Sequence, residues 1–151
     1  YAQLGNPNAF KFGIPKVTYL NFSFSGLKTS ILYFVKSKVK DDDSFIKNNL
    51  NDLCASIQNS IISILIDKLK KAIKITGIKE IAIAGGVSAN SELRKSIKEF
   101  ENFGFKTYIA PFEYCTDNAG MIGITGYYKY LNNKFTCQKI SASSRMKVDQ
   151  Y

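Results

Sequence analysis

The stretch that decides the fold is IAIAGGVSAN, residues 81–90, in which an apolar run is followed by two glycines and a polar segment. This order predicts a β-strand, a tight turn and the start of a helix, which is the repeating unit of α/β folds. The strand is almost wholly apolar, so we expect it to be buried on both faces, as in a parallel sheet.

The double glycine is also a candidate binding turn. Gly85 and Gly86 have no Cβ, so a bound group can approach the backbone closely. The free N–H groups and the dipole at the start of the next helix favour an anion such as a phosphate. On this interpretation Gly85, Gly86 and the amide of Asn90 contact a nucleotide. A purely structural turn, in which Ser88 caps the helix, explains the same residues equally well.

A second motif, YCTDN at residues 114–118, follows the next predicted strand. The strands that end at Ala84 and Ala110 should leave the same edge of the sheet, so both turns would face one cleft. A carboxylate beside a phosphate site usually needs a cation between the two anions. Asp117 is therefore a candidate metal ligand. The alternative is that Thr116 caps a helix and Asp117 only balances the helix dipole.

The rest of the chain shows the same alternation of helix and strand. Gly77 and Gly104 are expected to end helices. The expected strands are 17–24, 80–84 and 106–110, and the expected helices are 25–40, 45–76, 89–101 and 116–131. The predicted fold class is therefore α/β.

Two further polar segments are candidate sites. NFSFSGLKT, residues 21–29, offers Ser25 as a helix cap and Lys28 as an anion contact, and a structural role alone also accounts for it. The acidic run Asp41–Asp43 has the ligand type for a metal. Carboxylates also gather at helix starts and solvated turns, and this is the better explanation of the run.

Composition narrows the chemistry. The 151 residues contain no histidine, which excludes a histidine general base, a Ser-His-Asp triad and a histidine metal ligand from within this chain. Cys54, Cys115 and Cys137 have no CxxC spacing and fit a reducing, cytoplasmic setting. The longest aliphatic run is too short to span a bilayer, so we expect no membrane partner.

The formal net charge of +9 has two interpretations. A basic surface is typical of proteins that bind a polyanion such as RNA. Of the 21 basic residues, however, only Arg94 and Arg145 are arginine, the residue preferred for forked phosphate contacts. An AT-rich genome also produces many lysines, so both explanations stay open.

Three motifs together resemble the carboxyl-terminal half of one known family. FSFSGLKT, AGGVSANSELR and APFEYCTDNAGMIG, in this order and at these separations, resemble the TsaD family of tRNA adenosine threonylcarbamoyltransferases, formerly described as O-sialoglycoprotein endopeptidases or glycoproteases. The resemblance implies an ASKHA (actin and hexokinase-like) lobe with a mixed sheet flanked by helices. It also implies that residues 1–20 are a linker from an amino-terminal lobe and that residues 21–151 form the carboxyl-terminal lobe.

The resemblance implies a function as well. Family members pass a threonylcarbamoyl group from threonylcarbamoyl-adenylate to the adenosine beside the anticodon, at position thirty-seven, in tRNAs that read codons beginning with adenine. It implies that Gly85, Gly86 and Asn90 contact the adenylate and that Asp117 binds one divalent metal, Fe(2+). The family completes this metal site with histidines of an HxxxH motif, which this chain lacks.

The same resemblance sets the expected partners and the limits of the chain. We expect tRNA, threonylcarbamoyl-adenylate and other proteins of a tRNA-modification complex as partners, in the cytoplasm, and no activity from these residues alone. Two other functions remain open: a lobe of an ASKHA-fold sugar or acetate kinase, and a non-catalytic scaffold paralogue. A kinase would need a catalytic aspartate from outside this chain, and the presence of Asn90 and Asp117 argues against a scaffold.

Overall fold

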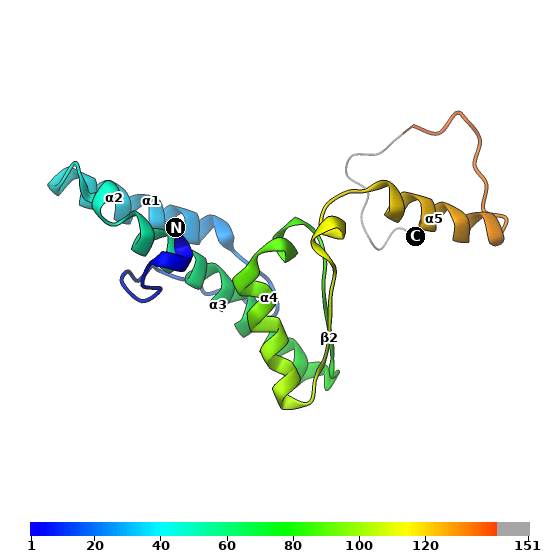
Figure 1. Ribbon diagram of the computed structural model, residues 1–151, viewed down its shortest axis with the longest axis horizontal. Helices are drawn as coiled ribbons and strands as arrows, with labels where there is room; N and C mark the ends of the chain where they lie inside the picture. Colours follow the sequence, from blue (N-terminus) through cyan, green and yellow to red (C-terminus); the bar gives the residue numbers. More distant parts are fainter. Residues whose placement is uncertain (142–151) are drawn as a thin grey trace.

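The computed structural model describes residues 1–141, in which helices pack against one face of a small parallel sheet (Figure 1). Its helices and strands are, in chain order, α1 (Phe24–Asp41), α2 (Phe45–Asn48), α3 (Leu50–Thr76), β1 (Glu80–Ile83), α4 (Ser91–Lys98), β2 (Lys106–Ile109) and α5 (Ala119–Leu131). Short 3-10 helices lie at η1 (Ala2–Leu4), η2 (Gly86–Ala89), η3 (Glu99–Phe103) and η4 (Phe112–Tyr114). The predicted α/β class is confirmed, and residues 142–151 of the expected lobe lie outside the described range.

α3 is the central element, because it contributes to two cores on opposite sides. Ile62 and Ile64 lie two residues apart, about 200° around the helix, and both are buried. Ile62 packs with the sheet and α4, whereas Ile64 packs with α1 and the amino-terminal segment. The buried members of the first core are Ile62, Ile81, Leu93, Ile97 and Phe100, and those of the second core are Phe12, Leu27 and Ile64.

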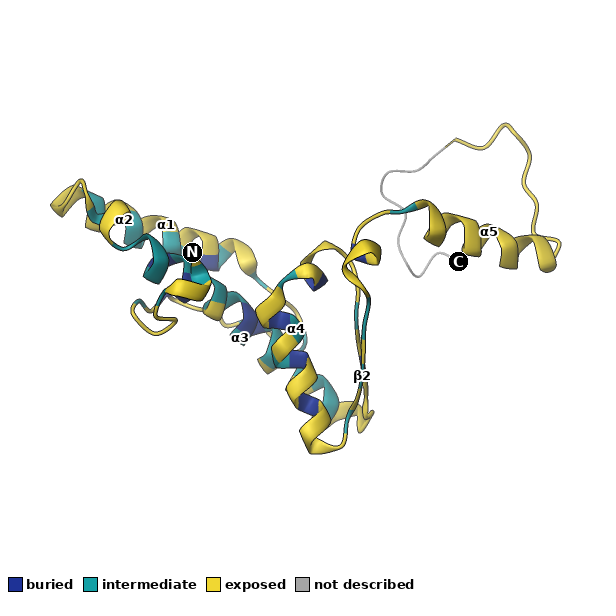
Figure 2. Ribbon diagram, in the orientation of Figure 1, coloured by how far each residue is buried: buried dark blue, intermediate teal, exposed yellow. Residues whose placement is uncertain are grey.

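The sheet, as far as the described chain forms it, pairs β1 and β2 in parallel, with Ile83 opposite Ile109. Ile81 points into the first core and is buried, whereas Ala82 and Tyr108 on the other face are exposed. The expectation that this strand is buried on both faces is therefore wrong. The helices α3 and α4 cover only one face of the two strands within residues 1–141 (Figure 2).

The amino-terminal segment, residues 1–20, lies along α3. The N–H of Phe10 donates to Oγ of Ser56 (3.1 Å), and the Ser56 side chain is fully buried. Phe12 packs against Leu27 in the second core, where burying one leucine contributes about 1.5–3 kcal/mol. The segment that we expected to act as a linker thus also supplies core residues.

The predicted strand at 17–24 does not form. Tyr19 has a φ of 54°, a left-handed conformation that interrupts an extended strand. Lys68 on α3 is buried, and its Nζ donates to the carbonyls of Val17 (3.3 Å) and Tyr19 (2.7 Å). A lysine side chain therefore satisfies backbone acceptors that a neighbouring strand would otherwise have to pair.

Two helices end at glycines, as predicted. Gly77 and Gly104 have φ values of 70° and 79°, and α3 and η3 end immediately before them. The expected single helix over 45–76 is wrong, because Asn49 interrupts it. The Nδ2 of Asn49 donates to the carbonyl of Phe45 (2.9 Å), so its side chain takes up a carbonyl at the end of α2.

α5 extends away from the rest of the described chain (Figure 1), and none of its residues is buried (Figure 2). Its large apolar side chains are all exposed: Met121, Ile122, Ile124, Tyr127, Tyr128, Tyr130 and Leu131. A continuous apolar surface of this kind is typical of a face that another protein segment covers. Among residues 1–141, no helix combines the length and the apolar character that crossing a bilayer requires.

Candidate functional site

The two turns that carry the motifs leave the same edge of the sheet. β1 and β2 run parallel, with Ile83 opposite Ile109, so their carboxyl ends are adjacent. Residues 84–90 continue from β1 and residues 110–118 continue from β2, above the sheet in Figure 1. The prediction that both strand ends share one edge is confirmed.

The first turn is closed by Ser88. Its N–H and its hydroxyl both donate to the carbonyl of Gly85, at 2.9 and 2.6 Å, and its side chain is buried. Gly85 has φ 81° and ψ 173°, a conformation that is essentially restricted to glycine. Gly86 is exposed, and no atom lies within 4 Å of the point where a Cβ would stand. The turn therefore needs glycine at position 85 for its backbone, and it leaves open space beside Gly86.

Asn90, not Ser88, caps the helix that follows. Its Oδ1 accepts from the N–H of Leu93 (2.9 Å), and its Nδ2 donates to Oε1 of Gln58 on α3 (3.1 Å). A primary amide has two donors and two lone pairs. One N–H and one lone pair of Asn90 thus remain for a ligand, while the other two fix the side chain between α3 and α4.

Two cavities share residues of α3, and one of them borders this turn. The first, about 330 Å³, lies between α3 and α4 and has Asn90 in its wall. The second, about 430 Å³, is lined by Lys28 of the third motif. Both cavities share Ile57 and Ile61 of α3, but the third motif does not line the first cavity and the first motif does not line the second. Asp117 lines neither of these two cavities.

Two other predicted helix caps are also displaced, each by two residues. α1 begins after Ser23 rather than after Ser25, and α5 begins after Asn118 rather than after Thr116. The Oδ1 of Asn118 accepts from the N–H of Met121 (3.0 Å). Ser23 makes no such bond at the start of α1, so only its backbone marks the helix start there.

Asp117 lies on the second turn, before the start of α5, and it is exposed. No hydrogen bond or ion pair from within residues 1–141 engages its carboxylate. The alternative that Thr116 caps the helix is wrong, since Asn118 has that role and Asp117 lies before the helix rather than in its first turn. The carboxylate is free to bind a ligand that comes from outside the described chain.

Arg94 on α4 contacts both turns. Its Nη1 donates to the carbonyl of Ser88 (3.0 Å) and to Sγ of Cys115 (3.7 Å). Its Cζ lies 4.3 Å from the centroid of the Phe112 ring, close enough for a cation–π contact. Sequence reasoning missed this residue, and the signal that could have found it is an arginine within a chain whose basic residues are nearly all lysine.

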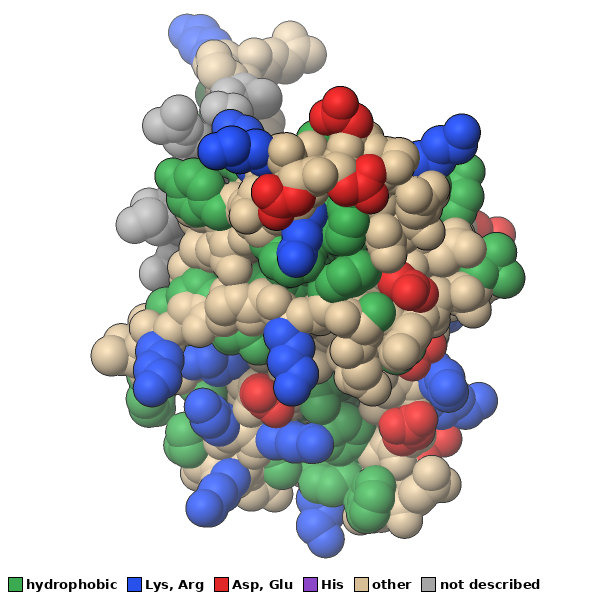
Figure 3. Space-filling model, turned by 90° about the vertical axis from the view of Figure 1, so that its left-hand side faces the viewer, with side chains coloured by type: hydrophobic (Ala, Val, Ile, Leu, Met, Phe, Trp, Pro, Cys, Tyr) green, Lys and Arg blue, Asp and Glu red, His purple; other side chains and the backbone are tan. Residues whose placement is uncertain are grey.

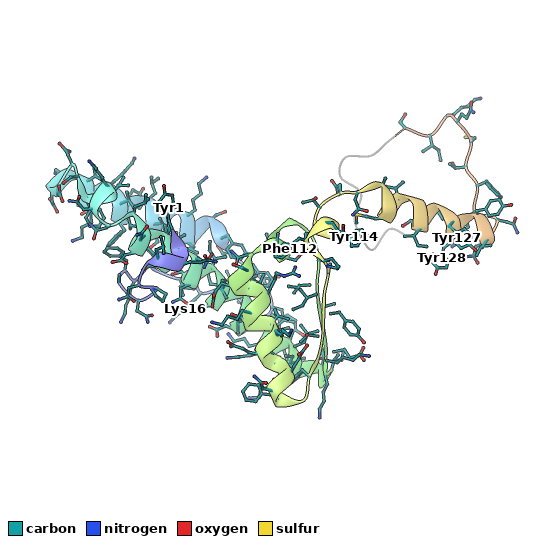
Figure 4. All side chains as sticks on the ribbon, viewed as in Figure 1. Tyr1, Lys16, Phe112, Tyr114, Tyr127 and Tyr128 are labelled. Carbon is teal, nitrogen blue, oxygen red and sulfur yellow. The ribbon has the colours of Figure 1, made fainter. Side chains whose placement is uncertain are left out.

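Figure 4 shows where the aromatic side chains near these turns lie. Phe112 and Tyr114 lie on the second turn, just after the carboxyl end of β2, whereas Tyr127 and Tyr128 lie at the far end of α5. The site residues supplied by the described chain therefore gather at the sheet edge, and α5 leads away from them.

The described residues do not by themselves fit a metal. Among residues 1–141, no group of three or more Cys, Asp or Glu side chains is arranged to hold an ion. The acidic run forms a turn instead, because Asp42 Oδ1 accepts from the N–H (2.9 Å) and the hydroxyl (2.6 Å) of Ser44. These two bonds lower the pKa of the Asp42 carboxyl below its ordinary value.

Comparison with known proteins gives one consistent result. The model of the TsaD family, tRNA N6-adenosine threonylcarbamoyltransferase, matches residues 1–124, which contain all three motifs. A protein of that name from Christiangramia forsetii is 59% identical over 148 residues, which cover 97% of this chain and 44% of that protein. Proteins of the same name from Cytophaga hutchinsonii and Phocaeicola vulgatus are 48% and 50% identical, over 98% and 97% of this chain and 43% and 44% of their own lengths. The chain thus spans less than half the length of the curated relatives it matches.

Proposed function

The chain belongs to the TsaD family, whose members have the ASKHA fold, and on that premise we propose that it forms part of a tRNA threonylcarbamoyltransferase. The donor is threonylcarbamoyl-adenylate, and the acceptor is the adenosine at position thirty-seven of tRNAs that read codons beginning with adenine. The exocyclic amine attacks the carbamoyl carbon. A carbon–nitrogen bond forms as the bond from the carbamoyl carbon to the phosphate oxygen breaks, adenosine monophosphate leaves, and the amine loses a proton.

The arrangement of the two turns is the observation that carries this proposal. The register of Ile83 against Ile109 brings the GGVSAN turn and the turn of Asp117 to one edge of the sheet. The carboxyl edge of parallel strands is where α/β folds bind nucleotides. The open space beside Gly86 gives the adenylate room to approach the backbone. The free N–H and lone pair of Asn90 are suited to a ribose or phosphate oxygen.

We also propose that Asp117 supplies one ligand of a divalent metal, Fe(2+). The support is a carboxylate that is exposed and not engaged within residues 1–141. The remaining ligands would be histidines from outside this chain, which contains none. When bound, such a metal supplies Lewis-acid chemistry at the substrate oxygens.

The partners follow from the proposed reaction. tRNA is the acceptor, and the net charge of +9 suits a polyanion. On the face shown in Figure 3, lysines are scattered with carboxylates among them, so this face carries no single basic patch. Genome composition thus remains an alternative source of the charge. We propose a cytoplasmic tRNA-modification complex as the setting, because its substrates are found there.

A second protein surface is needed beside this chain. The exposed apolar side chains of α5 and the open face of the sheet are suited to packing against another lobe. We propose that residues 1–151 alone neither transfer the group nor bind iron tightly, and that activity requires the lobe that carries the histidines. Tight one-to-one iron binding by residues 1–151 would overturn this part of the proposal.

The test uses the full-length protein with tRNA and threonylcarbamoyl-adenylate, and mass spectrometry of the nucleosides as the readout. Asp117→Ala should abolish formation of the modified adenosine, whereas Asp43→Ala, which changes an exposed carboxylate of the acidic turn, should leave it intact. Retained modification by Asp117→Ala would remove Asp117 from the site. A wild-type protein that turns over ATP with small sugars, and does not modify tRNA, would favour the kinase instead.

A further inference from the structure

Arg94 is the side chain that joins the two turns at the sheet edge. It donates to the carbonyl of Ser88 on one turn and to the sulfur of Cys115 on the other. We propose that Arg94 is a positioning residue, which fixes the segment that carries Asp117 relative to the glycine turn. The inference rests on the proposed function, because it assigns Arg94 to the site of that reaction.

The two points that Arg94 connects are themselves firmly held. Ser88 and Cys115 are 1% and 2% exposed, so each is packed on nearly all sides. Ser88 is tied to Gly85 by two hydrogen bonds, and Sγ of Cys115 donates to the carbonyl of Pro111 (3.4 Å). Because Ser88 and Cys115 are both held in place, the contacts of Arg94 fix the distance between the two turns.

Little else in the described chain holds the turns together. The pairing of the strands ends at Ile83 and Ile109. Beyond it, within residues 1–141, hydrogen bonds between segments 84–90 and 110–118 run only indirectly, through Arg94. Asp117 lies two residues after Cys115, so the position of its backbone depends on where this link holds the turn.

The contacts require arginine rather than a basic residue in general. The guanidinium is planar, so it lies over the ring of Phe112 while its N–H groups point to two acceptors. The ammonium of lysine is a point charge that cannot stack in this way. Of the 21 basic residues of the chain only two are arginine, and one of them occupies the position whose contacts need its shape.

The proposal predicts a loss of rate rather than a loss of binding. In the full-length protein, Arg94→Ala should lower kcat by about 10- to 100-fold, the range seen when a residue that orients a ligand is removed. The KM for threonylcarbamoyl-adenylate should change much less, because Gly86 and Asn90 stay in place. Arg94→Lys should not restore the rate. Added guanidinium ion should partly restore Arg94→Ala, and added ammonium should not.

A matched control lies on the same helix. Lys98 is exposed on α4 and makes neither bridging contact, so Lys98→Ala should retain the wild-type kcat and show no response to guanidinium. Hydrogen exchange followed by mass spectrometry supplies a readout that does not depend on activity. In Arg94→Ala, peptides covering 110–118 should exchange faster than in the wild type, while peptides of α1 should not change.

The outcomes separate the two proposals. If the wild type modifies tRNA and Arg94→Ala keeps its kcat, the positioning role is overturned. The same holds if kcat falls but Arg94→Lys restores it fully, since charge alone would then suffice. If the wild type modifies no tRNA, the proposed function fails. Unchanged exchange over 110–118 in Arg94→Ala would then still overturn the link between the turns.

Discussion

Alanine substitutions at the two adjacent glycines give a matched test of the first turn. Gly85 has φ 81° and ψ 173°, a region in which other residues cost about 1–3 kcal/mol. At neither glycine does an added Cβ come within 4 Å of another atom, so no clash contributes. Gly85→Ala should therefore lower the free energy of unfolding by about 1–3 kcal/mol. Gly86→Ala should change it by less than about 1 kcal/mol, because its backbone is compatible with alanine.

Urea unfolding, followed by circular dichroism, measures this difference. With a slope of about 2 kcal/mol per molar urea, the midpoint should fall by about 0.5–1.5 M for Gly85→Ala and move by less than about 0.5 M for Gly86→Ala. Equal midpoints for the two variants, or a less stable Gly86→Ala, would refute the account of the turn.

The same pair separates stability from binding. A methyl group at position 86 occupies the open space that the proposed adenylate approaches, so Gly86→Ala should raise the KM for threonylcarbamoyl-adenylate in the full-length protein while its stability is unchanged. An unchanged KM in Gly86→Ala would show that Gly86 does not contribute to binding threonylcarbamoyl-adenylate. Gly85→Ala cannot decide this point, because it alters the backbone of the turn as well.

Two further predictions concern capping and pH. Asn90→Ala removes a helix cap and the bond to Gln58, and should lower the free energy of unfolding by about 1–2 kcal/mol, whereas Asn90→Ser keeps a cap and should lose less in the same urea assay. Ser44→Ala should raise the pKa of Asp42 towards its ordinary value, as measured by NMR titration. The hydrogen-bonded carboxylate of Asp42 stabilises the turn above its unfolded pKa, and this contribution is lost as the pH falls through the lowered folded pKa.

Local signals predicted much of the fold. The spacing of apolar residues located α1, α3 and the helix after the double glycine, and Gly77 and Gly104 ended helices as expected. Both glycines take positive φ values, which other residues adopt only at a cost, so a glycine after an apolar helical pattern predicts the end of the helix from sequence alone. The positions of β1 and β2 were also correct, because short apolar runs bounded by glycine or proline have few alternatives.

The wrong predictions concern features that depend on contacts between residues far apart in the sequence. The alternation at 17–24 favours a strand, but Lys68, some fifty positions along the chain, takes the carbonyls of Val17 and Tyr19. The burial of β1 on one face depends on which elements cover the sheet, and a strand's own composition does not reveal this. Arg94 was missed for the same reason, since its three contacts come from two turns that are separate in sequence.

The position of α3 between two cores has a consequence for how the protein unfolds. Ile62 and Ile64 belong to different clusters but share one helix, so neither cluster can lose its packing while the helix keeps the other intact. The two cores should therefore melt together as one cooperative unit. Among residues 1–141, α5 contributes no side chain to either core, so its contribution to stability depends on the surface that covers it and not on this unit.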